Sequence, residues 1–154
     1  MNRVKLITQE QADEIYRRLP KSSKFIFAIG METGLRISDI LQLRNSDVAN
    51  SLRAYVSRLD TVRDFPISDW LHNELINRYG YQYPARYIFP GRSSPRRPIH
   101  RTTYHRHIKT ALDGLDFDAS AHSTRKFYLN DLAALRQCNS TETREEAAND
   151  RELN

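Results

Sequence analysis

The sequence has very little cysteine and no long apolar run. Its single cysteine, Cys138, cannot form a disulfide within the chain, which excludes a disulfide-stapled fold and favours a reducing compartment. No apolar run approaches the roughly 18 residues of a membrane helix, and the first residues, Met-Asn-Arg-Val-Lys, lack the apolar core of a signal peptide. We therefore expect a cytoplasmic protein with no membrane partner.

Acidic residues are missing from a long central stretch of the sequence. No Asp or Glu lies between Glu74 and Asp113. The cations of this stretch are Arg78, Arg86, Arg92, Arg96, Arg97, Arg101, Arg106 and Lys109. One sign of charge over such a length favours a polyanion as partner, and arginine can grip phosphate oxygens through two parallel hydrogen bonds. A solvated basic face without a ligand is the alternative.

The remaining composition is that of one globular domain followed by a polar tail. Hydrophobic residues make up 39% and charged residues 28% of the 154 positions. From Gln137 onward two arginines face five acids, so this part has a net charge of −3 and residues 1–136 carry +8. We expect one domain over residues 1–137 and a polar tail over residues 138–154 with almost nothing to bury.

Helix signals dominate the first part of the chain. Thr8 and Gln11 have capping-box spacing, and the helix that they begin is stopped by Pro20. A second, buried helix starts near Ser22 or Ser23 and is ended by Gly34, which can adopt the left-handed conformation. Ile37, Ile40, Leu41 and Leu43 predict a short amphipathic helix directly afterwards.

The remaining elements predict a mainly α fold with a small antiparallel β-sheet. Strands are expected over residues 54–58 and 61–67, with a turn near Leu59 and Asp60. Helices are expected from Ser68 to Gly80, from Thr102 or Thr103 to about Leu112, and from Ser123 to about Leu135. Residues 80–98 predict a long irregular connection with a short buried piece at residues 87–89.

Three side chains suggest a phosphate site. Arg36 lies between the glycine turn at Gly34 and the short helix, while His122 and Arg125 are three residues apart and share a helix face. Two fixed guanidiniums can stabilise charge on a phosphodiester, and an imidazole can donate or relay a proton. Taken separately, each has a simpler interpretation, as an exposed arginine at a helix start and as an unrelated surface pair.

The other histidines do not predict a metal centre. His105 and His107 diverge on a helix, and the nearest acid to the group formed with His100 is Asp113. A metal site requires converging ligands and a supporting carboxylate. We expect solvated or phosphate-contacting histidines and no bound metal.

Two sequence boxes together resemble the tyrosine recombinases, or phage integrases. Residues 33–43, Thr-Gly-Leu-Arg-Ile-Ser-Asp-Ile-Leu-Gln-Leu, are similar to the family's first-arginine box, and residues 121–127 are similar to its H-x-x-R box. A hairpin, a helix, the Ile-Phe-Pro stop at residues 88–90 and a basic helix lie between them in the order of the family. The resemblance extends from about Leu6 to Leu135.

The resemblance implies a catalytic domain that breaks and rejoins DNA in recombination or integration. Arg36 and Arg125 would clamp the scissile phosphate, and His122 would assist proton transfer. The family's tyrosine would attack phosphorus, leaving a 3′-phosphotyrosyl link and a free 5′-hydroxyl, so that no cofactor is required. Double-stranded DNA is the expected partner, with a homo-oligomer on DNA, in a bacterial or phage-encoded protein associated with the nucleoid. The predicted DNA-binding residues are Arg58, Arg63, Arg92, Arg96, Arg97, Arg101 and Arg106.

Three departures from the family leave an alternative open. No lysine lies between Lys24 and Lys109, where the family carries a hairpin lysine that protonates the leaving oxygen. The later histidine or tryptophan box is poorly matched near Asn149, and no tyrosine follows Tyr128. Tyr128 and Tyr104 are expected to be packing residues. The alternative function is a catalytically inactive DNA-binding regulator or accessory protein on the same scaffold.

Overall fold

The computed structural model describes residues 5–79 and 83–134. Its elements, in chain order, are α1 (Gln9–Arg18), α2 (Lys21–Thr33), α3 (Ile37–Leu41), the 3₁₀ turn η1 (Asn45–Asp47), β1 (Leu52–Val56), the 3₁₀ turn η2 (Ser57–Leu59), β2 (Thr61–Phe65), α4 (Asp69–Tyr79) and α5 (Arg101–Ala111). Residues 123–134 form a further helix. The fold is therefore mainly helical with one two-stranded antiparallel sheet, as expected.

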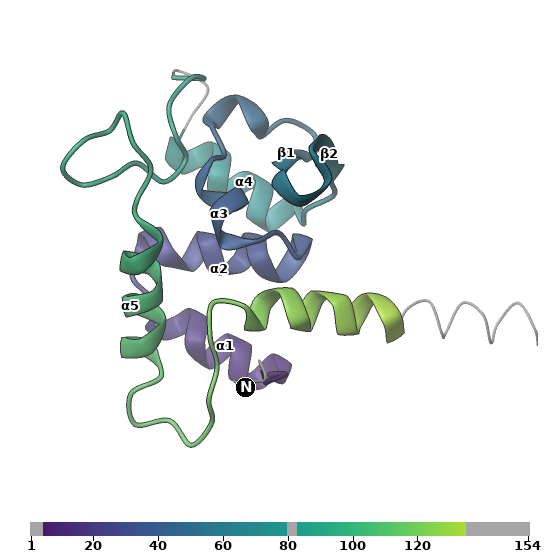
Figure 1. The fold of residues 1–154 in the computed structure, drawn as a ribbon, viewed down its shortest axis with the longest axis vertical. Helices are drawn as coiled ribbons and strands as arrows, with labels where there is room; N and C mark the ends of the chain where they lie inside the picture. The colour runs from purple at the N-terminus through teal and green to yellow at the C-terminus, as the bar shows by residue number, and fades with distance from the viewer. Residues whose placement is uncertain (1–4, 80–82, 135–154) are drawn as a thin grey trace, which may run out of the picture.

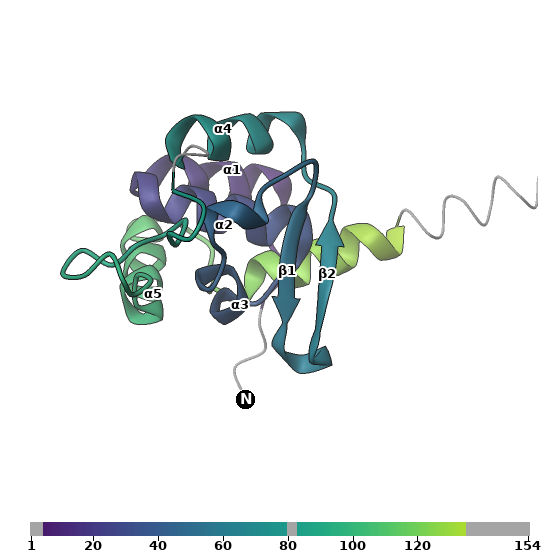
Figure 2. The same cartoon turned by 90° about the horizontal axis from the view of Figure 1, so that it is seen from above.

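Helix α2 is the centre of the domain and contacts α1, α3 and α4 (Figure 1). Helix α5 crosses the ends of α1 and α2 on one side of the domain, and the hairpin lies on the other side. In Figure 1, helix 123–134 lies between α2 and α1, and its C-terminal half projects beyond them. Seen from above, α3 and the hairpin lie on one side of the domain and α1 and α4 on the other (Figure 2).

The predicted start of α1 is confirmed, whereas α2 begins slightly earlier than expected. The Thr8 side chain accepts from the Gln11 backbone N–H, and the Gln11 side chain accepts from the Thr8 N–H in return. Helix α2 starts at Lys21 rather than at Ser22 or Ser23, because the Pro20 carbonyl already accepts the first helical hydrogen bond from Lys24. The fixed φ of proline, here −59°, suits this position.

The turn after α2 has the left-handed geometry expected at Gly34. Its φ is 69°, and its N–H donates to the Gly30 carbonyl at 2.9 Å. The Thr33 hydroxyl donates to the Ile29 carbonyl and accepts from the Leu35 N–H, which fixes the chain on both sides of the glycine. Helix α3 therefore begins only three residues after this turn.

Strand β1 lies two residues earlier than predicted, whereas β2 begins at Thr61 as predicted and ends two residues earlier, at Phe65. Leu52 pairs with Phe65 and Val56 with Thr61, so that β1 ends before the residues that were expected to complete it. Residues 57–59 form η2, and Asp60 closes the turn with a φ of 48°. Arg58 therefore lies in the turn and not, as predicted, in a strand. Strand β2 stops at Phe65 because Pro66 has no N–H to donate to the ladder.

The long connection before α5 is held to the domain by backbone hydrogen bonds. Ile88 donates its N–H to Leu43, and both Ile88 and Phe89 are buried, which confirms the short buried piece. Helix α5 begins at Arg101, one residue before the earliest predicted start, because the His100 side chain accepts from the Thr102 N–H and caps the helix. The predicted helix ends at Gly80 and Leu135 and the tail 138–154 lie outside the described residues.

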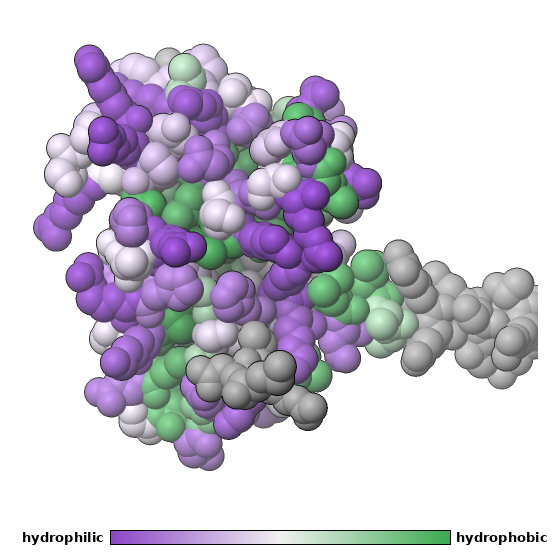
Figure 3. Space-filling model, in the orientation of Figure 1, coloured by the Kyte–Doolittle hydropathy of each residue, from purple (hydrophilic) through white to green (hydrophobic). Residues whose placement is uncertain are grey.

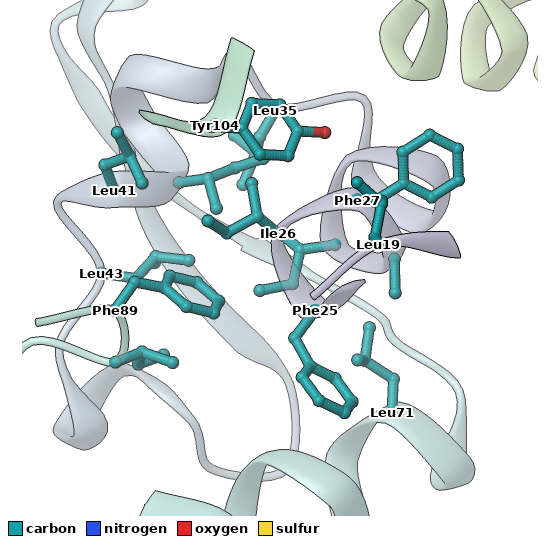
Figure 4. Close-up of a cluster of buried hydrophobic side chains, with 14 of the residues drawn as sticks. Leu19, Phe25, Ile26, Phe27, Leu35, Leu41, Leu43, Leu71, Phe89 and Tyr104 are labelled. Atoms are coloured by element: carbon teal, nitrogen blue, oxygen red, sulfur yellow. The ribbon is translucent and has the colours of Figure 1, made fainter. Parts of the chain in front are cut away.

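Apolar side chains from nearly every element meet beneath α2. The buried cluster includes Leu19, Phe25, Ile26, Leu35, Leu41, Leu43, Leu71, Phe89 and Tyr104 (Figure 4). The elements before and after the long connection between α4 and α5 therefore share one hydrophobic core. Across residues 5–79 and 83–134, none of the helices has the length and apolar character needed to cross a bilayer.

Candidate phosphate-binding site

The three side chains selected from the sequence line one surface hollow. Arg36, His122 and Arg125, together with Lys126 and Leu129, surround a volume of about 460 Å³. Arg36 is the N-cap residue of α3. His122 directly precedes helix 123–134, and Arg125 lies in the first turn of that helix. Residues separated by 86 positions in the chain are thus brought together at the meeting point of two helix starts.

The turn at Gly34 positions both arginines at once. The Arg125 Nη1 donates to the Gly34 carbonyl at 3.1 Å, and Arg36 follows that turn by two residues. Helix 123–134 approaches α2 so closely that a Cβ at Gly30 would lie 2.6 Å from the Thr124 Oγ1. The Arg125 guanidinium and the backbone at Arg36 are therefore held at one junction between two helices.

The hollow is dominated by positive charge. Burial is the main cause that lowers the pKa of the Arg125 guanidinium, and the nearby cations Arg36 and Arg58 lower it further. The ordinary arginine pKa is so high that the group remains charged at neutral pH. The ion pairs Arg17–Glu14, Arg18–Glu14 and Arg78–Glu74 lie on α1 and α4, away from Arg36 and Arg125.

Asp39 is a site residue that the sequence reasoning missed. The residue is 6% exposed, and its Oδ2 has no hydrogen-bond partner within the described structure. It is the only anion among the groups that perturb the pKa of Arg125, which it raises. The signal was present in the sequence, because Asp39 lies three residues after Arg36 and so shares its side of α3.

The N-terminal half of α5 lies beside the hollow. Burial, followed by the nearby charges of His122 and Arg101, lowers the pKa of the His105 imidazole. Arg101 and His105 are four residues apart and therefore lie on the same face of α5. This face extends the positive surface of the hollow toward the arginine-rich connection that precedes α5.

The remaining predicted DNA-binding residues are spread over the molecule. Arg58, in η2, lies near Arg125, whereas Arg63 is exposed on β2 opposite Ala54. Exposed positions that do not line the hollow are also occupied by Arg92, Arg96, Arg97 and Arg106. On the face shown in Figure 3, hydrophilic side chains cover most of the surface between α5 and the hairpin. The structure thus separates a compact cationic site from a dispersed set of arginines.

The other histidines have structural contacts. His100 caps α5, and the His107 Nδ1 lies 2.7 Å from the Ser23 hydroxyl. Within the residues that the structure describes, no group of three or more His, Cys, Asp or Glu side chains is arranged to hold a metal ion.

The two tyrosines expected to be packing residues are confirmed in that role. Tyr104 is 1% exposed in the core, and burial raises the pKa of its phenol well above the ordinary value (Figure 4). The ring of Tyr128 lies against Gly34, where an added Cβ would come within 2.3 Å of its Cδ1. Tyr128 does not line the hollow.

Comparison with solved structures identifies the fold as that of the DNA recombinase catalytic domains. A lambda integrase tetramer bound to a Holliday junction matches with a TM-score of 0.66 and 19% identity, over 83% of this chain and 42% of that chain. XerA recombinase matches with a TM-score of 0.69 and 14% identity, over 86% of this chain and 51% of the other. The lambda integrase catalytic core matches with a TM-score of 0.60 and 19% identity, over 82% and 81% of the two chains.

The family model described as the phage integrase family matches residues 5–135, and the chain belongs to that family. No curated protein sequence matches it. The chain covers about half or less of the length of the first structures that it resembles, with 42% and 50% for the two lambda integrase complexes.

Proposed function

We propose that this domain binds double-stranded DNA and performs strand breakage and rejoining in site-specific recombination or DNA integration. The observation that carries the proposal is the convergence of Arg36, His122 and Arg125 on one hollow from two separate helix starts. We further propose that the protein acts in the cytoplasm, at the nucleoid, as a homo-oligomer on DNA. The solved lambda integrase structures are described as dimers and a tetramer on DNA.

The two arginines bind the scissile phosphate. Arg36 and Arg125 donate to its non-bridging oxygens, where negative charge accumulates as a nucleophile attacks phosphorus. Asp39 offsets a small part of the repulsion that Arg36 and Arg58 exert on the Arg125 guanidinium, since it is the one group that raises the pKa of Arg125. His122, which is exposed at the rim, donates a hydrogen bond to the phosphate and moves a proton.

The covalent step follows the chemistry that the family resemblance implies. A tyrosine oxygen forms a bond to phosphorus and loses its proton, while the bond to the 5′ oxygen breaks and that oxygen takes a proton. The product is a 3′-phosphotyrosyl link and a 5′-hydroxyl, and reversal of the same step rejoins the strand. The bond energy is conserved in the link, so no nucleotide or metal ion is consumed.

Two parts of the family's machinery are altered in this chain. Arg58 occupies the hairpin turn near Arg125, where it supplies charge to the phosphate but releases a proton poorly because of its high pKa. Tyr104 is buried in the core and the Tyr128 ring packs against Gly34, and these packing roles argue against either as the nucleophile. We propose that the attacking tyrosine is a residue other than these two.

Covalent trapping tests the reaction. The full chain is incubated with a pool of nicked duplexes of random sequence, in which the cut releases a short 5′-hydroxyl fragment that diffuses away and prevents religation. We expect a protein–DNA adduct that survives denaturing electrophoresis and is lost in Arg36→Ala and Arg125→Ala. Salt-sensitive DNA binding without any adduct would instead establish the catalytically inactive regulator.

Binding measurements test the phosphate site separately. Arg36→Ala and Arg125→Ala should each weaken duplex binding by about 1–3 kcal/mol, the range for hydrogen bonds to charged groups. Arg17→Ala is the matched control, because Arg17 is an exposed α1 arginine paired with Glu14 and does not line the hollow. Equal affinity of the parent, both site variants and the control would contradict the assigned site.

A further inference from the structure

A second surface of helix 123–134 forms a groove that has no part in the proposed DNA chemistry. Successive helix residues are about 100° apart. Arg125, Lys126 and Leu129 therefore face the cationic hollow, while Phe127 and Asp131 lie on nearly the opposite side of the helix. These latter residues line a hollow of about 550 Å³ between helix 123–134, α1, α2 and the start of α4, here called the α1–α4 groove.

The floor of the α1–α4 groove is apolar and aromatic. Phe27 and Met31 of α2 and Phe127 of the last helix meet Tyr16 and Trp70 there. The rings of Tyr16 and Trp70 are in edge contact, with centroids 5.9 Å apart, and Trp70 keeps 48% of its surface exposed. A large exposed indole that is held by aromatic neighbours is typical of a surface that buries a partner's side chains.

The rim of the groove is acidic, in contrast to the rest of the domain. Asp13 and Asp131 are exposed at its edge, and Glu32 accepts hydrogen bonds from the Ser68 N–H and hydroxyl at 2.8 and 2.6 Å. No lysine or arginine occurs among the described residues that line it, although the Lys24 Nζ lies 5.2 Å from the centroid of the Tyr16 ring. Residues 1–136 carry +8 overall, so an acidic rim around an apolar floor is a local reversal of sign.

This sign distinguishes between the occupants that an apolar groove could take. Double-stranded DNA and anionic lipid are both repelled by the rim. The chain's own tail from Gln137 onward carries −3, so it has the same sign as the rim. An amphipathic helix with apolar anchors at positions i, i+3, i+4 and i+7 and lysine or arginine beside them matches both the floor and the rim.

We propose that the α1–α4 groove is a docking site for a cationic amphipathic helix of a partner protein. The apolar face of that helix packs on Trp70, Met31 and Phe127, and its flanking cations pair with Asp13 and Asp131. The phosphate-binding hollow and the docking site thus use opposite faces of helix 123–134. Occupation of one face leaves the other accessible, so a partner can be held while the domain is on DNA.

The single tryptophan of the sequence provides a direct readout, because Trp70 lines the groove. The probe is a synthetic peptide of about 14 residues, with leucine at the anchor positions and lysine elsewhere, a length at which a helix is marginal alone and can be stabilised by docking. Two matched peptides have glutamate in place of lysine, or the same leucines and lysines in scrambled order. None of the three contains tryptophan.

We expect a saturable blue shift of Trp70 emission with the leucine–lysine peptide and at least tenfold weaker binding of the other two. Asp13→Asn combined with Asp131→Asn should weaken binding about fivefold, as two surface charge pairs together contribute about 1 kcal/mol. Asp116→Asn combined with Asp118→Asn removes the same charge elsewhere and should leave the affinity within about twofold. Arg36→Ala and Arg125→Ala should also leave it unchanged, which makes this result independent of the DNA function.

Several outcomes would overturn the proposal. Equal affinity for the lysine and glutamate peptides would show that the rim does not select charge. If both double asparagine variants weakened peptide binding equally, the effect would come from the net charge of the protein and not from the rim of the groove. An unchanged Trp70 spectrum at saturating peptide would place the peptide elsewhere, and a dimer in sedimentation that the peptide dissociates would assign the groove to a second copy of this chain.

Discussion

The arginines of the phosphate-binding hollow differ from those of the long connection in how they are held. Arg36 and Arg125 project from two helix starts that are joined by a hydrogen bond from Arg125 to the Gly34 carbonyl. Arg92, Arg96 and Arg97 are exposed on an irregular segment between α4 and α5. Under the proposed function, Arg36 and the tethered Arg125 act together on one phosphate, whereas the arginines of the irregular segment add affinity for any backbone.

The largest effect is expected from a substitution in the turn at Gly34, which lies between Arg36 and Arg125. Gly34→Ala places a Cβ on a residue with a φ of 69° and within 2.3 Å of the Tyr128 ring. We expect the free energy of unfolding to fall by roughly 2–4 kcal/mol, the combination of backbone strain and overpacking. Urea unfolding followed by circular dichroism measures it.

Gly114→Ala is the matched control for that change. Gly114 also has a positive φ, 75°, but an added Cβ meets nothing within 4 Å. Only backbone strain of about 1 kcal/mol is then expected. If both variants lose the same stability, the contact between the turn and helix 123–134 does not hold the site together.

A double-mutant cycle should distinguish the two groups of arginines next. If Arg36 and Arg125 bind one phosphate, the loss in the double variant differs from the sum of the single losses by at least about 0.5 kcal/mol. Arg92→Ala and Arg97→Ala should instead add within the error of about 0.3–0.5 kcal/mol, because each contacts its own phosphate. Duplex binding by fluorescence anisotropy provides the affinities of the parent, the four single variants and the two double variants. Additive losses of binding free energy at Arg36 and Arg125 would contradict the hypothesis that both side chains bind the same phosphate.

The salt dependence of binding sharpens the comparison further. Arg97→Ala should weaken binding similarly on all duplex sequences and should reduce the slope of log K against log salt by about 1. A variant that lost affinity on one sequence alone would show that Arg97 reads bases rather than the backbone.

The smallest expected effect concerns α5, which joins the two regions. Burial, followed by Arg106, lowers the pKa of His107 below 6.5, while its ring contacts the Ser23 hydroxyl. The unfolded chain therefore binds more protons than the folded one below about pH 7, and stability falls as the pH drops through 6.5. His107→Gln should flatten this part of the stability curve, measured as the urea midpoint between pH 5 and 8. An unchanged curve would mean that His107 does not titrate differently on folding.

Local sequence signals predicted most of the helices because their causes are local. The capping box at Thr8, the stop at Pro20 and the left-handed Gly34 depend on neighbouring residues, and all three are present in the structure. The hairpin was placed less accurately. Its register depends on which side chains the core accepts, so β1 ends at Val56 and Arg58 lies in a turn.

The candidate site was predicted in part. The motifs at Arg36 and at His122–Arg125 identified three of the residues that line the hollow. Asp39 was missed although its spacing from Arg36 is visible in the sequence, since its burial and its effect on Arg125 are evident only in the packed structure. The position of His105 beside His122 was missed for the same reason, because two residues on different elements become neighbours only through packing.

The sequence by itself determined the order of the elements, the family boxes and the segregation of charge along the chain, because these depend on residue type and spacing. Only the tertiary structure decided that Arg36 and Arg125 share one turn and that helix 123–134 has opposite charge environments on its two faces. The physical reason is close packing: contacts between residues distant in the sequence depend on how Gly30, Gly34 and their partners allow the helices to approach.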